Sequence, residues 1–344
     1  MTDDHLSKRQ QARIEANAAD RLAPWLRDAR AAAGANPDAG IPGLVVSHLR
    51  REVEVAPLGA AEGDENLRVR CFLRATVPPV VSGDRILFEA DAADPARGVI
   101  TARLPRLSLL SRHTPKGLRP VCANLDLLLI TVAPEPAPHA DLIDRYLVAA
   151  TLDDLEAVLV FNKCDLETAA DGAALRALYD RIGIDTYAVS AGTGEGLDAL
   201  RARLDGRTAA FVGQSGVGKS SLINALIPGA GAETGDLSGR QNRGRSRGRH
   251  TTSTTRLYHT DAGVIIDSPG IREFAADIPD EAALVAGMPE IAEAAAHCRF
   301  RDCHHESEPD CAVHAGLEDG SIERSRFASF RALRAEITER AGGR

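Results

Sequence analysis

Two nucleotide-binding signatures stand in this chain in reversed order, and that order constrains the fold more than any other feature. A phosphate loop of the pattern G-x-x-x-x-G-K-[ST] runs from Gly213 to Ser220. An Asn-Lys-x-Asp element, of the type that reads guanine, runs from Asn162 to Asp165 and therefore precedes the loop. In ordinary GTPases the phosphate loop comes first. The sequence thus predicts a circularly permuted GTPase domain, in which every part is present but rejoined in another order.

The phosphate loop has the strand-loop-helix context that its motif requires. It follows the apolar run 209–212 and opens a helical stretch over 221–226. Its glycines let the backbone approach the ligand, successive N–H groups hold phosphates, Lys219 reaches the outer phosphates and Ser220 ligates Mg²⁺. The loop alone predicts a nucleoside triphosphate without specifying the base. The predicted phosphate-binding residues are Gly213, Gln214, Ser215, Gly216, Val217, Gly218, Lys219, Ser220 and Ser221.

The base preference is predicted from the element that follows the strand-like run 158–161. The Asp165 carboxylate accepts hydrogen bonds from guanine N1–H and the 2-amino group together, whereas adenine would leave this acceptor unpaired. A tetrapeptide of this kind often arises by chance. Support comes from Ser190-Ala191, which follows another strand-like run and resembles the loop whose backbone N–H meets guanine O6. The predicted base site is Asn162, Lys163, Asp165, Ser190 and Ala191.

Two switch segments complete the set. Asp267-Ser268-Pro269-Gly270 matches the D-x-x-G switch, with Asp267 bound to Mg²⁺ through water and Gly270 facing the γ-phosphate. Between this segment and the phosphate loop, either Thr251 or Thr252 is expected to supply a hydroxyl to Mg²⁺, and the sequence does not separate them. Five parts at consistent strand ends make a chance match a poor explanation.

The order of these parts, with the surrounding sequence, resembles the RsgA (YjeQ) family of ribosome small subunit-dependent GTPases over nearly the whole chain. The resemblance implies an N-terminal OB-fold, a permuted GTPase domain and a C-terminal zinc domain. It also implies a protein that binds the small (30S) ribosomal subunit and its rRNA late in maturation, with GTP turnover that the subunit stimulates. The matching landmarks are 82–85, 104–106, 118–124, 133–136 and 142–147.

The hydrolytic group is the least determined part of the predicted site. Ile271 follows the D-x-x-G segment, where many GTPases carry a water-orienting Gln, so intrinsic hydrolysis should be slow. His250 is the candidate catalytic residue, because the resembling family carries a His at this place in its Gly-x-His-Thr-Thr pattern. The alternative is a His with a structural role in the loop.

A cysteine and histidine cluster near the C-terminus predicts a metal site. Cys298, Cys303, His304, His305 and Cys311 suit one tetrahedral structural Zn²⁺ closed by four protein ligands, rather than a disulfide or an open catalytic site. The resemblance implies the pattern C-x₄-C-x-H-x₅-C, which selects His305 over His304. The other three cysteines are interpreted as ordinary core or loop residues.

The chain divides into four predicted parts. Residues 1–39 form an arm and linker, and 40–116 carry five short strand-like runs that suit an OB-like β-barrel, with an SH3-like barrel or a β-sandwich nearly as compatible. Residues 117–277 alternate strands and helices, which predicts a mostly parallel α/β sheet. Residues 278–344 are expected to be helical and zinc-binding, with helices over 281–297 and about 321–339.

The distribution of charge along the chain indicates what kind of partner it binds. The 344 residues carry a net charge of −8, yet the stretch from Arg97 to Asn124 has six basic residues and no acidic one, and 240–249 holds five arginines. Confined basic stretches on an acidic chain favour contacts with RNA backbone over a solvated face. No signal peptide or membrane span is expected, so the prediction is a cytoplasmic monomer. The alternatives are a P-loop ATPase or kinase, a scaffold that does not hydrolyse GTP, and a GTPase acting on the large subunit.

Overall fold

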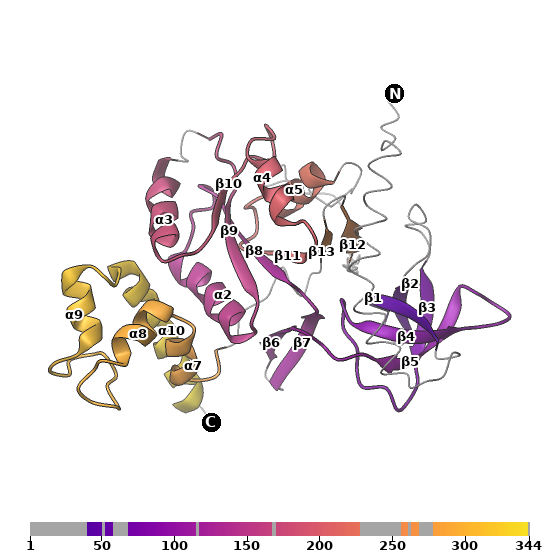
Figure 1. Ribbon diagram of the computed structural model, residues 1–344, viewed down its shortest axis with the longest axis horizontal. Helices are drawn as coiled ribbons and strands as arrows, with labels where there is room; N and C mark the ends of the chain where they lie inside the picture. The colour runs from indigo at the N-terminus through magenta and orange to yellow at the C-terminus, as the bar shows by residue number, and fades with distance from the viewer. Residues whose placement is uncertain are drawn as a thin grey trace, which may run out of the picture.

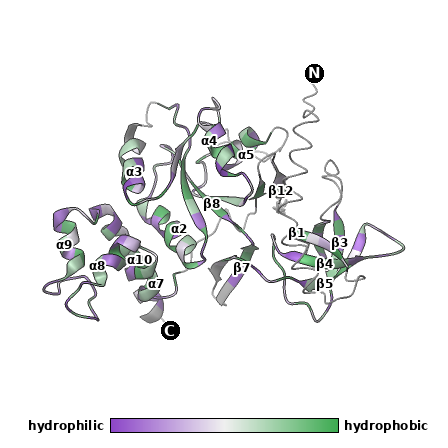
Figure 2. Cartoon of the chain, viewed as in Figure 1, coloured by the Kyte–Doolittle hydropathy of each residue, from purple (hydrophilic) through white to green (hydrophobic). Residues whose placement is uncertain are grey.

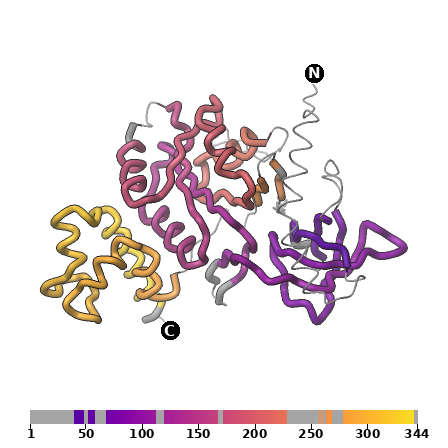
Figure 3. Tube along the Cα trace, viewed as in Figure 1, coloured from indigo at the N-terminus to yellow at the C-terminus, as the bar shows by residue number. Residues whose placement is uncertain are grey.

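The computed structural model describes residues 40–49, 52–57, 68–114, 117–166, 170–227, 256–260, 263–267 and 278–342. In chain order these form a β-barrel, a hairpin, a central α/β domain and a C-terminal group of helices. Figure 1 shows the barrel, the α/β domain and the C-terminal helices arranged in a row, and Figure 3 shows that the chain passes through them in that order. Among the described residues, no helix is long and apolar enough to cross a membrane.

The N-terminal part is a closed barrel in which neighbouring strands follow the order β1-β2-β3-β5-β4 and β4 returns to β1. Strands β3 and β5 are parallel and the other pairs are antiparallel. This closed five-stranded topology is OB-like, and it rejects the sandwich interpretation. The strands are β1 Ile41–Leu49, β2 Glu52–Pro57, β3 Val69–Leu73, β4 Arg85–Ala90 and β5 Arg97–Arg103.

A rigid junction joins the barrel to the rest of the chain. Asp84 is fully buried, and its carboxylate accepts two hydrogen bonds from Arg106, at 2.7 and 2.8 Å. Asn124 donates to the carbonyl of Gly83 at 2.8 Å, and a Cβ on Gly83 would lie 2.1 Å from the carbonyl oxygen of Ala123. The hairpin β6 Leu109–Thr114 and β7 Gly117–Ala123 lies between Arg106 and Asn124 in the chain and spans the predicted domain boundary at 116/117.

The central domain contains a sheet whose described strands have the order β10-β9-β8-β11-β13-β12. All neighbours are parallel except β12 and β13. The chain starts in the middle at β8, moves outward to β10, returns to β11 beside β8, and then fills the other half. The strands are β8 Leu127–Val132, β9 Glu156–Phe161, β10 Thr186–Ala188, β11 Thr208–Val212, β12 Arg256–His259 and β13 Val264–Asp267.

Helices cover both faces of this sheet. Helices α2 (Ala140–Leu152) and α3 (Ala170–Arg181) contribute to one buried cluster, and α4 (Leu197–Arg203) and α5 (Lys219–Leu226) contribute to another. Strand β8 is buried along its whole length, as expected for a central strand covered on both faces. Figure 2 agrees with this layering, with hydrophobic residues along β8 and α2 and hydrophilic ones on α4.

The C-terminal part consists of short helices around a separate core. The single helix predicted over 281–297 is wrong: Gly287 ends α7 (Glu281–Ala286), and Pro289 starts α8 (Pro289–Ala295) because its ring suits the first helical position. The prediction also missed α9 (Ala312–Asp319), which Gly320 ends at φ 80°. The last helix, α10, runs from Arg324 to Gly342.

Candidate nucleotide and metal sites

The predicted nucleotide-binding segments meet at one edge of the sheet. Because β8, β9, β10, β11 and β13 are parallel, their carboxyl ends lie on the same side. The phosphate loop follows β11, the Asn-Lys-Cys-Asp element follows β9, Ser190 follows β10, and Asp267 ends β13. Successive strands are added toward β10 on one side of β8 and toward β12 from β11 onward, so the strand order reverses between β8 and β11. Open α/β sheets bind ligands at such switch points.

Glycines in the phosphate loop occupy positions that other residues would not tolerate. Gly213, Gly216 and Gly218 have φ values of 132°, 86° and 94°. A Cβ on Gly213 would lie 2.2 Å from the carbonyl oxygen of Thr131, and one on Gly218 would lie 2.3 Å from Nδ2 of Asn162. Helix α5 starts directly after the loop and has no side-chain cap, so its first N–H groups are available to an anion.

Asn162 joins three of these segments through one buried side chain. It is 2% exposed, its Nδ2 donates to the carbonyl of Val217 at 2.8 Å, and its Oδ1 accepts from the backbone N–H of Ala191 at 3.2 Å. The neighbouring Lys163, at φ 62°, donates from Nζ to the carbonyls of Gly216 at 2.9 Å and Glu135 at 2.6 Å. The base element is thereby fastened to the phosphate loop, while Asp165 remains exposed.

The Ser190 loop is folded by its own hydrogen bonds. The buried Ser190 hydroxyl accepts from the backbone N–H groups of Gly192 at 3.2 Å and Thr193 at 3.1 Å. Gly196 closes the loop at φ 71°, where a Cβ would lie 2.1 Å from the carbonyl oxygen of Ala188. The position of the Ala191 backbone is therefore set by the protein itself.

Lys219, the cationic residue of the phosphate loop, is held by the backbone of the loop itself. Lys219 Nζ donates to the carbonyls of Gly213 and Gln214, both at 2.7 Å, so its charge lies over the loop. Asp267 is half-buried at the end of β13. Four other predicted residues, His250, Thr251, Thr252 and Gly270, lie outside the described residues, and their roles stay predictions.

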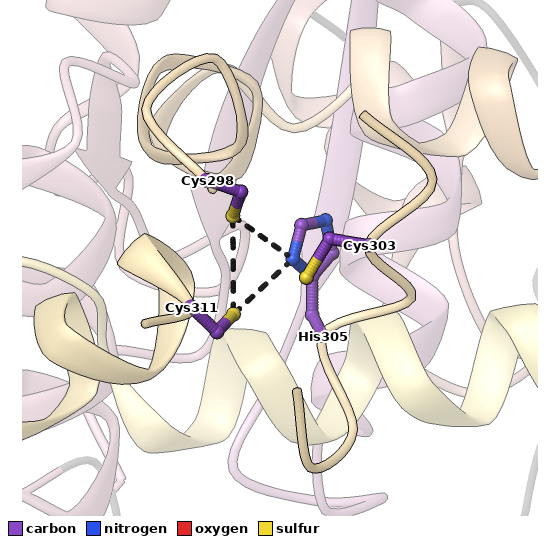
Figure 4. Close-up of side chains that lie close together, drawn as sticks. All are labelled: Cys298, Cys303, His305 and Cys311. Atoms are coloured by element: carbon purple, nitrogen blue, oxygen red, sulfur yellow. Dashed lines mark hydrogen bonds between the residues drawn. The ribbon is translucent and has the colours of Figure 1, made fainter. Parts of the chain in front are cut away.

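The C-terminal cluster brings four potential zinc-ligand atoms close together. The ligand atoms of Cys298, Cys303, His305 and Cys311 all lie within 4.8 Å of one another. Figure 4 shows the three sulfur atoms and the His305 ring converging on one centre. His305 Nδ1 is 3.6 Å from Cys298 Sγ and 3.4 Å from Cys311 Sγ, and the two sulfurs are 3.9 Å apart. Zn–S and Zn–N bonds of about 2.3 and 2.0 Å give tetrahedral edges of roughly 3.5 to 3.8 Å.

The surroundings of the cluster distinguish the two neighbouring histidines. His305 is buried with a φ of 59°, and its ring faces the sulfur atoms (Figure 4). His304 is exposed, and its Nδ1 lies 3.4 Å from Glu281 Oε1. Burial raises the pKa of the Cys303 thiol to about 12 and lowers the pKa of His305. A divalent cation would offset this cost for thiolates, so the donor set fits Zn²⁺ with no open position.

Known proteins match both the central part of this chain and nearly its full length. Residues 103–277 match the family model described as RsgA GTPase. A protein from Azotobacter vinelandii, named small ribosomal subunit biogenesis GTPase RsgA, is 44% identical, with 98% of this chain and 99% of that protein aligned. A protein of the same name from Pseudomonas aeruginosa is 43% identical with the same coverage. The chain belongs to the RsgA GTPase family.

Solved structures agree with the RsgA-family assignment. YjeQ from Thermotoga maritima matches with a TM-score of 0.67 and 30% identity, over 87% of this chain and 98% of that one. YloQ, described as a circularly permuted GTPase, matches in fold with a TM-score of 0.65 and 23% identity, over 87% of this chain and 96% of that one. The prediction of a permuted GTPase with an N-terminal barrel and a C-terminal Cys₃His cluster is confirmed.

Sequence reasoning did not identify two groups that support the phosphate loop of this RsgA-family GTPase. The Glu135 carbonyl holds Lys163, and the buried Tyr146 phenol is hydrogen-bonded to the backbone of Gly213. Both lie in segments that the sequence marked only as family landmarks. No motif signals them, because a backbone carbonyl has no residue signature and a buried tyrosine resembles ordinary core.

Proposed function

We propose that this GTPase binds the small ribosomal subunit and its rRNA and acts late in the maturation of that subunit, hydrolysing GTP to GDP and phosphate with subunit-stimulated turnover. The proposal rests chiefly on the full-length similarity to proteins named for small subunit biogenesis. The supporting structural observation is the single edge where the base element, its partner loop and the phosphate loop are tied together by Asn162.

In this proposal each part of the nucleotide site has a defined role. Residues 213–221 hold the phosphates and Ser220 ligates Mg²⁺, which neutralises charge on the β- and γ-phosphates when bound. Asp165 reads guanine, and the Ser190-Ala191 loop faces O6. Asp267 holds Mg²⁺ through water, Thr251 or Thr252 supplies a switch hydroxyl, and Gly270 faces the γ-phosphate. His250 is the candidate residue for orienting the attacking water, since Ile271 has no polar group to do so.

The zinc site has a structural role in this proposal. Cys298, Cys303, His305 and Cys311 would hold one Zn²⁺, closing a segment that carries little secondary structure between α8 and α9. With four protein ligands, the ion would have no position for a substrate.

The barrel offers a surface suited to RNA. Arg70 and Phe72 on β3 pair in register with Arg97 and Val99 on β5, and all four side chains are exposed. An aromatic ring beside a pair of guanidinium groups suits base stacking and phosphate contacts. Not every basic residue predicted for this role is free to play it, because Arg106 is bound to the buried carboxylate of Asp84. We further propose a cytoplasmic monomer.

The decisive experiment measures GTP turnover alone, with purified small subunits and with purified large subunits. The expected result is stimulation by small subunits only. Stimulation by large subunits only would support the alternative partner, and turnover insensitive to both would contradict subunit-dependent hydrolysis.

A second measurement tests the base. Unlabelled GTP, but not ATP, should displace a fluorescent GDP from the wild-type protein. Asp165→Asn should weaken GDP binding and improve binding of xanthosine diphosphate, because an amide can donate where the carboxylate only accepts. Unchanged preference in this variant would remove Asp165 from the base site.

A further inference from the structure

Helix α2 connects the phosphate loop to the C-terminal helices. One side of it packs on the sheet through Ile143, Tyr146 and Leu147. Tyr146 is 3% exposed, and its phenol is hydrogen-bonded to the backbone of Gly213, the first residue of the phosphate loop. A rigid helix therefore bears directly on the segment that holds the phosphates.

The other side of α2 carries a buried charge cluster. Asp144 is fully buried and its Oδ1 accepts from Arg326 Nη1 at 2.5 Å and from the Tyr179 hydroxyl at 2.6 Å. Arg326, 2% exposed, also donates from Nε to Glu290 Oε1 at 2.6 Å. These four residues belong to α2, α3, α8 and α10, so the cluster joins the α/β domain to the C-terminal helices.

Beside the charge cluster, the C-terminal helices contact α2 closely at one point and leave a space next to it. Gly287 approaches α2 so closely that a Cβ would lie 2.5 Å from Val148 Cγ1. Next to this contact is a cavity of about 180 Å³ between α2 and the α7–α8 turn, lined by Leu147, Ala150, Pro289 and Arg326. This space is partly open to solvent, so the C-terminal helices touch α2 without filling the region beside the Gly287 contact.

The hydrogen bonds and ion pairs of the charge cluster set the orientation of the C-terminal helices on α2. A buried ion pair stabilises little compared with apolar residues of the same size, but removing one partner is costly because the other charge is left buried. The planar guanidinium of Arg326 contacts carboxylates on two different helices, and lysine cannot reproduce that fork. The cluster therefore fixes the orientation of α2 relative to α8 and α10.

We propose that Arg326 is a positioning residue for nucleotide binding and turnover: through Asp144 it holds α2 so that Tyr146 supports the phosphate loop. Asp144 and Tyr146 are two residues apart on one helix and therefore point to different sides of it. The C-terminal region thus contributes to phosphate affinity from a distance. This inference rests on the phosphate-loop assignment made above.

A double-mutant cycle tests whether Arg326 and Tyr146 act on nucleotide binding through the same helix. Arg326→Lys, Tyr146→Phe and the double variant are compared by GDP affinity and by kcat and KM for GTP. Each single change should weaken GDP binding about threefold or more, and the double variant should be no weaker than the poorer single variant. Effects that multiply, or an unchanged affinity in Arg326→Lys, would overturn the proposal.

Two controls separate positioning from general damage. Arg181→Gln removes an exposed ion pair to Glu323 at the same interface but not on α2, and should leave GDP affinity unchanged. Zinc content and thermal midpoint are measured for every variant. If Arg326→Lys does not fold, Tyr179→Phe replaces it in the cycle, because it removes only one hydrogen bond to Asp144. GDP binding by the wild-type protein tests the phosphate-loop assignment itself. A wrong assignment can therefore be distinguished from a wrong proposal about Arg326.

Discussion

At the scale of single residues, Asn162 has the most demanding position in the nucleotide site. Its amide group donates to one loop and accepts from another, and it is almost completely buried. Aspartate has the same shape but only accepts hydrogen bonds when ionised, so it cannot satisfy the Val217 carbonyl. The residue type is therefore determined by the two loops rather than by the nucleotide alone.

Replacement of Asn162 should consequently weaken nucleotide binding without unfolding the protein. Asn162→Ala leaves the buried carbonyl of Val217 and the partly buried N–H of Ala191 without this partner, and we expect GDP affinity to fall about tenfold or more. Asn162→Asp retains the acceptor and loses the donor, and should also bind GDP more weakly than the wild type. Titration with a fluorescent GDP measures both effects. Wild-type affinity in both variants would contradict this account of the tether.

Asp153, which ends α2, links stability to pH. Burial raises the pKa of its carboxyl from 3.8 to about 6, and a negative charge is also unfavourable at a helix C-terminus. Between these values the folded protein holds a proton that the unfolded chain has lost. Stability therefore falls as pH rises through this window, and the loss is complete above it.

Asp153→Asn removes this penalty because an amide does not ionise. At pH 7.5 we expect the variant to be more stable than the wild type by about 1 kcal/mol, a value reduced for partial exposure of the group. The difference should shrink to nearly zero by pH 4. Urea unfolding of both proteins across this range measures it. A difference that does not vary with pH would show that the carboxyl titrates normally.

At the scale of secondary-structure elements, sequence predicted what depends on local signals. Motifs at the ends of parallel strands indicated one common site, since such ends meet at one edge of a sheet. The choice between an OB-like barrel and a sandwich depended on the pairing of β1 with β4 and of β3 with β5, which no local pattern encodes. No strand was predicted from the sequence at β12, whose four residues pair with β13.

The zinc segment provides a prediction at this scale. His305→Ala should release the metal and lower the thermal midpoint of the C-terminal region, because binding and local folding are coupled. His304→Ala is the matched control: its ring is exposed and directed at Glu281, so one zinc per chain should remain. Elemental analysis of protein prepared with ample zinc distinguishes them. Zinc loss in both variants, or in neither, would contradict the assigned ligand set.

At the scale of the whole molecule, the barrel packs against the strand pair β12–β13, which precedes the predicted second switch. Leu44 and Val46 of the barrel share a buried cluster with Leu257 on β12 and Ile266 on β13. Ile266 directly precedes Asp267, which ends β13. The next described residue along the chain is Ile278, which is buried in the C-terminal core. If the proposed switch roles hold, a change at the γ-phosphate has a packing route to the barrel and a short covalent route to the C-terminal helices.

Under the proposed function, nucleotide state and subunit binding are thermodynamically linked. If a non-hydrolysable GTP analogue tightens binding to the small subunit, the subunit must tighten binding of the analogue by the same factor. We expect the analogue-bound protein to bind small subunits about tenfold or more tightly than the GDP-bound protein, within the range common for coupled sites. Sedimentation with purified subunits measures both affinities. Lys219→Ala, which should bind triphosphate poorly, is the control and should show no response to added nucleotide. Equal affinities for the two nucleotide states, together with turnover insensitive to the subunit, would exclude a switch even if every nucleotide contact were correct, because a ligand that binds two states equally shifts neither.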